Sequence, residues 1–265
     1  MGMGHEHTAT ARPFGRGARW WTSPALRLWG ALAVLVLAWD ASGLDRWVMD
    51  RWADATGFGW RHHPWLAHWG HDAARTVVAW LFAGLWGCTV LALVRHGWRD
   101  ARSRRWLEAA LGVTLCLLLI AALKRSSLTS CPWDLARYGG TAQWVSHWAW
   151  GVPDGGPGRC FPGGHASAAF GWWPLALAWA PRRRPGAAAW PVAWYLWIGI
   201  GLVGLAFGAV QTVRGAHYPS HTLWTAWLCW TAALLHHAAW QWWGHRATTD
   251  PAVQATQTST STASP

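Results

Sequence analysis

Long apolar stretches alternate with short polar segments along most of this chain. A helix needs about 20 predominantly apolar residues to cross a bilayer core of about 30 Å. Six stretches approach this length, over roughly residues 20–39, 76–94, 106–123, 161–180, 187–210 and 222–243. The pattern therefore predicts an all-α protein, a polytopic membrane helical bundle of about six transmembrane helices.

The two ends of the chain lack this pattern. Residues 1–19 and 247–265 are polar, and segments that cannot bury enough apolar surface stay unfolded. We expect a disordered N-terminal arm, one six-span domain over residues 20–246 and a disordered tail. The first stretch follows a basic segment, as a signal peptide would, but it ends in LAWDASG without a small-x-small cleavage site. We interpret it as an uncleaved anchor.

The composition favours a membrane protein over the other classes. Apolar residues make up 52% of the chain and charged residues 12%, about half of the roughly 25% found in soluble domains. The mean hydropathy of +0.07 is low because the chain contains 29 tryptophans, whose amphipathic rings prefer membrane interfaces. These values argue against a disordered chain, a coiled coil and a typical soluble enzyme.

The charge distribution predicts the orientation. A net charge of +11 at first suggests nucleic acid, but the basic residues punctuate the apolar stretches instead of forming one face. One set of loops holds 13 of the 22, in the N-terminal arm, residues 95–105, residues 182–184 and Arg246. The positive-inside rule places this set in the cytoplasm. We therefore expect an inner-membrane protein with both termini inside and no nucleic-acid partner.

The five cysteines divide into two groups. Cys88, Cys116 and Cys229 lie within apolar stretches, where we expect small core residues. Cys131 and Cys160 lie in the large outer loop, in a compartment that permits disulfides. We expect them to form a bridge, the alternative being two free thiols.

Three polar segments, residues 123–140, 159–170 and 211–224, lie where apolar stretches meet the outer face. The second contains Pro-Gly-Gly-His, whose glycines Gly163 and Gly164 let the backbone approach a ligand beside His165. The free N–H groups of a helix start favour an anion there. The alternative is a tight turn that merely caps the helix.

The other two segments supply cations and imidazoles. His217 and His221 are four residues apart and share a face if the last helix begins near them, with Arg214 just before. Such a pair fits a zinc site with a third ligand such as His165, a nucleophile held by its neighbour, or polar residues at a wet interface. Lys124 is the single lysine of the chain. It is either a ligand cation or a snorkelling interfacial residue.

Together these segments resemble the motifs of the type 2 phosphatidic acid phosphatase superfamily, which includes bacterial lipid phosphatases and vanadium haloperoxidases. The family pattern runs KxxxxxxRP, then PSGH, then SRxxxxxHxxxD. Here the corresponding segments read KRSSLTSCP from Lys124 to Pro132, PGGH from Pro162 to His165, and VQTVRGAHYPSH from Val210 to His221. The order, the spacing and the expected outer placement all agree with the family.

Several motif positions depart from the family pattern. Cys131 stands in place of an arginine and Gly163 in place of a serine. The Ser-Arg pair of the third motif is Val210–Gln211, and its final aspartate is His221. Two phosphate-binding cations are thus missing from their usual places. Arg214 is a candidate to replace the missing arginine of the third motif, and Arg125 or Arg137 to replace that of the first. The alternative is that the protein is a degenerate, inactive member of the family.

The resemblance implies metal-independent phosphoryl transfer through a phosphohistidine. His217 would be the nucleophile, His165 the general acid for the leaving group, and His221 the residue that orients His217, with Asp134 supplying negative charge nearby. The phosphate oxygens would be held by Lys124, Arg214 and the N–H groups of Gly163 and Gly164. This chemistry requires no cofactor and no metal.

The substrate implied is a phosphorylated lipid of the bilayer, reached from the periplasmic side. Candidates are phosphatidic acid, phosphatidylglycerophosphate, a polyprenyl diphosphate and lipid A. The alternatives are a lipid phosphotransferase that uses the same intermediate, and a non-catalytic metal-binding or transport protein built on the three histidines.

Overall fold

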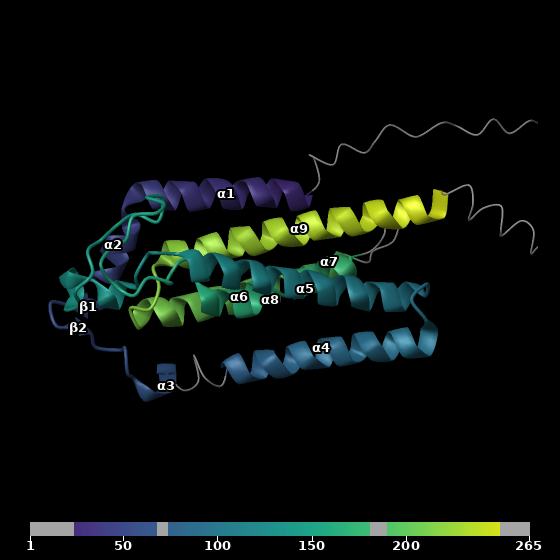
Figure 1. The fold of residues 1–265 in the computed structure, drawn as a ribbon, viewed down its shortest axis with the longest axis horizontal. Helices are drawn as coiled ribbons and strands as arrows, with labels where there is room; N and C mark the ends of the chain where they lie inside the picture. Colours follow the sequence, from purple (N-terminus) through teal and green to yellow (C-terminus); the bar gives the residue numbers. More distant parts are fainter. Residues whose placement is uncertain (1–23, 68–73, 181–189, 250–265) are drawn as a thin grey trace, which may run out of the picture.

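The computed structural model describes residues 24–67, 74–180 and 190–249, and these form a bundle of helices with almost no strand (Figure 1). The long helices lie side by side, and they are α1 (Pro24–Ser42), α4 (Ala74–His96), α5 (Ala101–Ser126), α8 (Trp190–Val213) and α9 (Pro219–Thr249). Two short helices, α6 (Gly164–Phe170) and α7 (Trp173–Ala178), pack against α5, α8 and α9. The predicted all-α membrane bundle is confirmed.

Four of the helices within the described residues are long and apolar enough to cross a membrane. They cover Pro24–Ser42, Arg75–His96, Ala101–Ser126 and Ala193–Val213, with mean hydropathies of 1.4 to 2.2. Each coincides with one predicted stretch, although residues 20–23 and 187–189 lie outside the described ranges. The sixth stretch is α9, which has 31 residues and interleaves polar side chains with its tryptophans.

The fourth apolar stretch is not one continuous helix, and here the prediction was wrong. It divides into α6 and α7, with Gly171 and Trp172 between them and Pro174 at the start of α7. Proline has no N–H for the preceding turn and its ring crowds the carbonyl four residues earlier. Glycine has a low helix propensity. The helix therefore breaks at Gly171 and Trp172, just before Pro174.

The loops at one end of the bundle fold into a cap. The cap contains α2 (Leu44–Met49), the antiparallel pair β1 (Ala53–Asp54) and β2 (Gly57–Phe58), α3 (Pro64–Ala67), and the 3-10 turns Pro132–Asp134 and Ala136–Tyr138. Met49, Phe58, Leu135, Tyr138 and Tyr218 form a small buried core there. The turn between α4 and α5, with its basic residues, lies at the opposite end (Figure 1).

Small residues let α8 approach α6 closely. A Cβ on Gly204 would lie 2.3 Å from the ring of Phe170, a far shorter separation than real contacts show. Close approach of this kind supplies the van der Waals packing that holds membrane helices together. Phe170 also packs with Trp173, Cys116 and Trp230, so the short helix α6 is fixed from several sides. This fixes the position of the Pro-Gly-Gly-His segment at the start of α6.

The cysteines follow the sequence prediction with one exception. Cys131 and Cys160 form a disulfide with a Cα–Cα distance of 5.1 Å, as predicted. Cys116 and Cys229 are buried in the core, also as predicted. Cys88, however, is exposed. The reason is that α4 lies at the edge of the bundle, where it packs mainly on α5.

We expect loss of the disulfide to destabilise the protein. The bridge closes a loop with a sequence separation of 29 residues, so its removal should cost roughly 3–4 kcal/mol in the chain-entropy model. The double variant Cys131→Ser/Cys160→Ser should unfold at a clearly lower temperature in a thermal scan of the detergent-solubilised protein. Cys88→Ser, which removes an exposed thiol, serves as the control. An unchanged midpoint in the double variant would contradict the assignment.

Candidate active site

The three polar segments meet at the capped end of the bundle. Lys124 lies in the last turn of α5, and His165 lies in the first turn of α6. His217 lies in the turn before α9, which begins at Pro219. Helix α6 contacts α5, α8 and α9, so segments nearly 100 residues apart in the sequence form one site.

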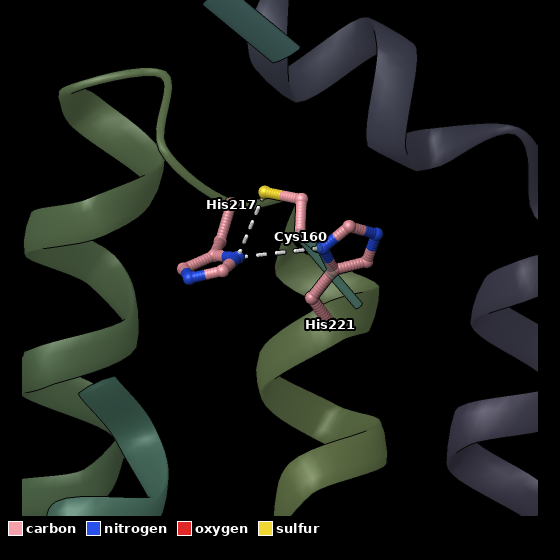
Figure 2. A group of neighbouring side chains, drawn as sticks. All are labelled: Cys160, His217 and His221. Carbon is pink, nitrogen blue, oxygen red and sulfur yellow. Dashed lines mark hydrogen bonds between the residues drawn. The ribbon is translucent and has the colours of Figure 1, made fainter. Parts of the chain in front are cut away.

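The two histidines of the last segment contact each other. Nδ1 of His217 lies 3.5 Å from Nδ1 of His221, and both side chains are buried (Figure 2). The backbone N–H of His217 donates to the carbonyl of Gln211 at 3.3 Å, which fixes the turn. When Nδ1–H of His217 donates to His221, the Nε2 lone pair of His217 stays available for attack on an electrophile.

His165 approaches His217 from the other helix. Their ring centroids are 6.2 Å apart, with an angle of 55° between the ring planes. A reacting group held between the two rings would touch both. One imidazole is then positioned to attack the reacting atom, and the other to donate a proton to the group that leaves this atom.

The start of α6 is tied to the backbone of α9. The N–H of Gly163 donates to the carbonyl of His221 at 3.2 Å, and the buried hydroxyl of Thr225 lies 3.0 Å from the carbonyl of Gly163. A Cβ on residue 163 would lie 3.3 Å from the carbonyl oxygen of His221, so a larger residue there would require a shift of a few tenths of an ångström. The N–H of Gly163 is therefore engaged within the protein and not directed to a phosphate, unlike our expectation.

Lys124 extends across the start of α6. A Cβ on Gly164 would lie 3.3 Å from Cδ of Lys124 and 3.8 Å from its Nζ. Glycine at this position leaves room for the lysine side chain to lie over the turn. The ammonium is close enough to act electrostatically on His217.

Arg214 contacts Gln211, the residue that stands in place of the family arginine. Its Nη1 donates to Oε1 of the buried Gln211 at 3.2 Å, and its Nε donates to the carbonyl of Arg61 at 3.2 Å. Gln211 occupies the place of the family arginine. The guanidinium of Arg214, the residue directly after the end of α8, therefore lies at the tip of the glutamine side chain that stands in place of the family arginine.

The environment of His217 keeps its imidazole neutral. The residue lies in a turn outside the membrane-spanning segments. Burial, and then the charges of Lys124, His221 and His165, hold the pKa of His217 well below its usual value of 6.5. Both effects disfavour the imidazolium form. A neutral imidazole is the form that can act as a nucleophile.

This environment predicts the pH dependence of catalysis. Because the pKa of His217 is lowered, its imidazole is still deprotonated when the pH falls to 6.5. The decrease in kcat/KM that protonation of His217 causes should therefore occur below pH 6.5. Lys124→Met removes a charge that opposes protonation and should move this limb to higher pH, besides lowering the rate. Arg125→Met removes an exposed charge one residue away and should leave the limb in place. Equal pH profiles for wild type and Lys124→Met would contradict the assignment.

The zinc site that the sequence offered as an alternative, with His165 as third ligand, differs from the cluster that forms among the described residues. The group close enough for a shared ion is Cys160, His217 and His221, whose ligand atoms lie within 4.8 Å of one another (Figure 2). Sγ of Cys160 is bonded to Cys131, and a disulfide sulfur is not the thiolate that zinc binds. His165, the third zinc ligand considered from the sequence, is not part of this group.

Two further expectations are corrected. Arg137 is exposed and pairs with Asp50 at 2.6–2.9 Å, away from the histidines, so it does not replace the arginine of the first motif. Asp134 accepts from the N–H of Cys131 at 3.3 Å, in the turn that begins with Pro132. This contact holds its carboxylate at the disulfide and not at His221.

The groups that surround His221 on its far side are not predicted from the sequence. The ring of His147 stacks on Phe161 and meets the ring of His221 edge-on, with centroids 6.2 Å apart. Nε2 of His147 lies 3.1 Å from Oδ2 of Asp40, in the last turns of α1. An acid directly after an apolar stretch was the one available signal for Asp40.

Comparisons with known proteins identify the family of the chain. No curated protein and no solved structure matches the chain. The family model of the PAP2 superfamily matches residues 105–245, more than half of the chain, and this range includes all three motifs. The chain therefore belongs to the PAP2 superfamily, the type 2 phosphatidic acid phosphatases.

Proposed function

We propose that this protein is a membrane phosphatase that hydrolyses a phosphorylated lipid at the outer face of the inner membrane through a phosphohistidine. Membership of the PAP2 superfamily supports phosphatase activity on phosphate esters. The observation that carries the proposal is the buried His217–His221 contact, with His165 facing His217 across a gap between their rings.

In the first step, Nε2 of His217 attacks phosphorus and the bond from phosphorus to the ester oxygen breaks. Protonated His165 donates its proton to the leaving alkoxide, which departs as the lipid alcohol. Water then attacks the phosphohistidine, and neutral His165 accepts the proton of that water. Free phosphate leaves and His217 returns to its starting state, so each group is restored after one turnover.

The phosphate is held by positive charge and backbone N–H groups. Lys124, Arg214 and the N–H of Gly164 are our candidates, while Gly163 supplies the close approach to α9. Phosphoryl transfer depends mainly on positioning and on stabilising charge on the phosphoryl oxygens. The contact between Arg214 and Gln211 supports the replacement of the missing motif arginine.

An apolar groove supports a lipid substrate. The groove has a volume of about 890 Å³ and lies between α4, the α6–α7 segment and α8, with Leu81, Ala168, Leu175, Ile200 and Phe207 among its lining residues. Ala168 lies three residues after His165, so both occupy one face of α6. An acyl chain in the groove would bring its phosphate to the histidines.

The orientation rests on the loops. The turn between α4 and α5 contains Arg99 and is flanked by Arg95 and Arg102. This turn lies at the end of the bundle opposite the start of α9 (Figure 1), and the sequence places His217 and His221 at that start. The positive-inside rule then assigns the site to the periplasmic face. The disulfide beside the site suits that oxidising compartment.

The experiment is a screen for phosphate release by the purified protein in detergent micelles. Phosphatidic acid, phosphatidylglycerophosphate, a polyprenyl diphosphate and lipid A are offered with and without EDTA. We expect release from at least one lipid, at a rate that EDTA leaves unchanged. Absence of release from all four, or activity lost with EDTA and restored by zinc, would contradict the proposal.

A further inference from the structure

The imidazole of His221 has a second nitrogen that does not face His217. Figure 2 shows this nitrogen on the far side of the ring, toward the α1–α2 segment. A cavity of about 220 Å³ lies there, and its lining includes Asp40, Asp45, Arg46, His147 and His221. The residue beside the nucleophile therefore connects the site to a polar cavity.

Asp40 is one of the two carboxylates that line this cavity. One oxygen, Oδ2, lies 3.1 Å from Nε2 of His147 and accepts hydrogen bonds from the indoles of Trp148 at 3.1 Å and Trp224 at 2.8 Å. The other oxygen, Oδ1, is buried and has no hydrogen-bond partner among the residues that the structure describes. The side chain is only 9% exposed.

The carboxylate of Asp45 and the guanidinium of Arg46, which also line the cavity, interact with other groups. Oδ1 of Asp45 accepts from the indole of Trp39 at 2.7 Å and from the N–H of Ser220 at 3.0 Å, which caps the start of α9. The guanidinium of Arg46 lies over the ring of Trp144, 5.3 Å from its centroid. Asp40 is thus the acid that lines the cavity with an unused buried oxygen.

We propose that Asp40 is a positioning residue that supplies, through His221, the negative charge that an aspartate at position 221 would supply directly. The inference rests on the proposed function. A phosphorylated His217 carries positive charge on its ring, and its Nδ1–H then donates more strongly to His221. Neutral His221 stabilises this positive charge less than a carboxylate at position 221 would. The carboxylate of Asp40, across the cavity on the far side of His221, supplies the missing negative charge.

Asp40→Asn tests the charge alone. The amide oxygen can take the place of Oδ2 and keep its donors, while the amide nitrogen takes the place of the unpartnered Oδ1. We expect kcat to fall at least about tenfold while KM changes less than about twofold. In a His221→Asp background a carboxylate already contacts His217, so the same substitution should change kcat less than about twofold. Asp54→Asn, at an exposed acid of the cap, is the matched control.

Two further readouts separate the possible outcomes. Orthovanadate, a phosphate analogue, should bind Asp40→Asn about tenfold more weakly in the parent and equally well in the His221→Asp background, whether or not turnover is measured. Thermal unfolding checks that the variants are folded. An equal loss of kcat in both backgrounds, or no loss in the parent, would overturn the inference. A parent protein that neither releases phosphate nor binds vanadate, or full activity in His217→Ala, would instead overturn the proposed function.

Discussion

His217→Ala is expected to abolish phosphate release, with a loss of about 10⁴-fold or more in kcat. No covalent intermediate can form without the imidazole, and the remaining groups can only bind and polarise the phosphate. The loss should be measured as phosphate release from the best lipid of the screen. In a brief reaction with labelled substrate, wild type should retain acid-labile label and His217→Ala should retain none.

Two controls make this result specific to the nucleophile. His96→Ala removes an exposed imidazole at the end of α4, near the basic end of the bundle, and should keep wild-type activity. Added imidazole can enter the space left in His217→Ala and should restore part of the rate. Wild-type activity in His217→Ala would exclude the phosphohistidine mechanism.

The second large effect is expected at His165. His165→Gln removes the general acid and should lower kcat about 10²- to 10⁴-fold with a lipid phosphate, because an alkoxide is a poor leaving group without a proton. With nitrophenyl phosphate, whose phenolate leaves readily, the loss should be much smaller. The ratio of the two losses measures proton donation independently of folding or phosphate binding.

A residue that only binds phosphate would give a different pattern. Lys124→Met should slow both substrates by similar factors, because the phosphoryl group is the same in each. Similar losses with both substrates in His165→Gln would therefore assign His165 to binding and not to proton transfer.

The departures from the family motifs are connected in space. Cys131, in the place of an arginine, is bonded to Cys160, whose Sγ lies 3.4 Å from Nδ1 of His217. Gln211 binds Arg214, and His221 contacts His217. Random decay would leave unrelated gaps. Here the replacements contact one another or His217, which argues for a rearranged site over an inactive one.

The tertiary structure decided which charges reach the site. Arg137 and Asp134 follow the first motif closely in sequence, yet one pairs with Asp50 and the other holds the turn at Cys131. Asp40 is more than 170 residues away from His221 in the chain but shares a cavity with it. Proximity along the chain does not predict which side chains meet when helices from both halves pack together. For the same reason the sequence could not show that the N–H of Gly163 is taken by the carbonyl of His221.

The sequence by itself determined the helical membrane class, the positions of the four long apolar helices and the three motifs. These follow from local properties, namely the length of apolar stretches, the turn residues between them and the spacing of histidines along one helix face. It also indicated the disulfide, because the two loop cysteines lie beside motifs that must meet. The break between α6 and α7, the exposure of Cys88 and the place of Asp40 behind His221 were decided only by packing, since each depends on which helices become neighbours.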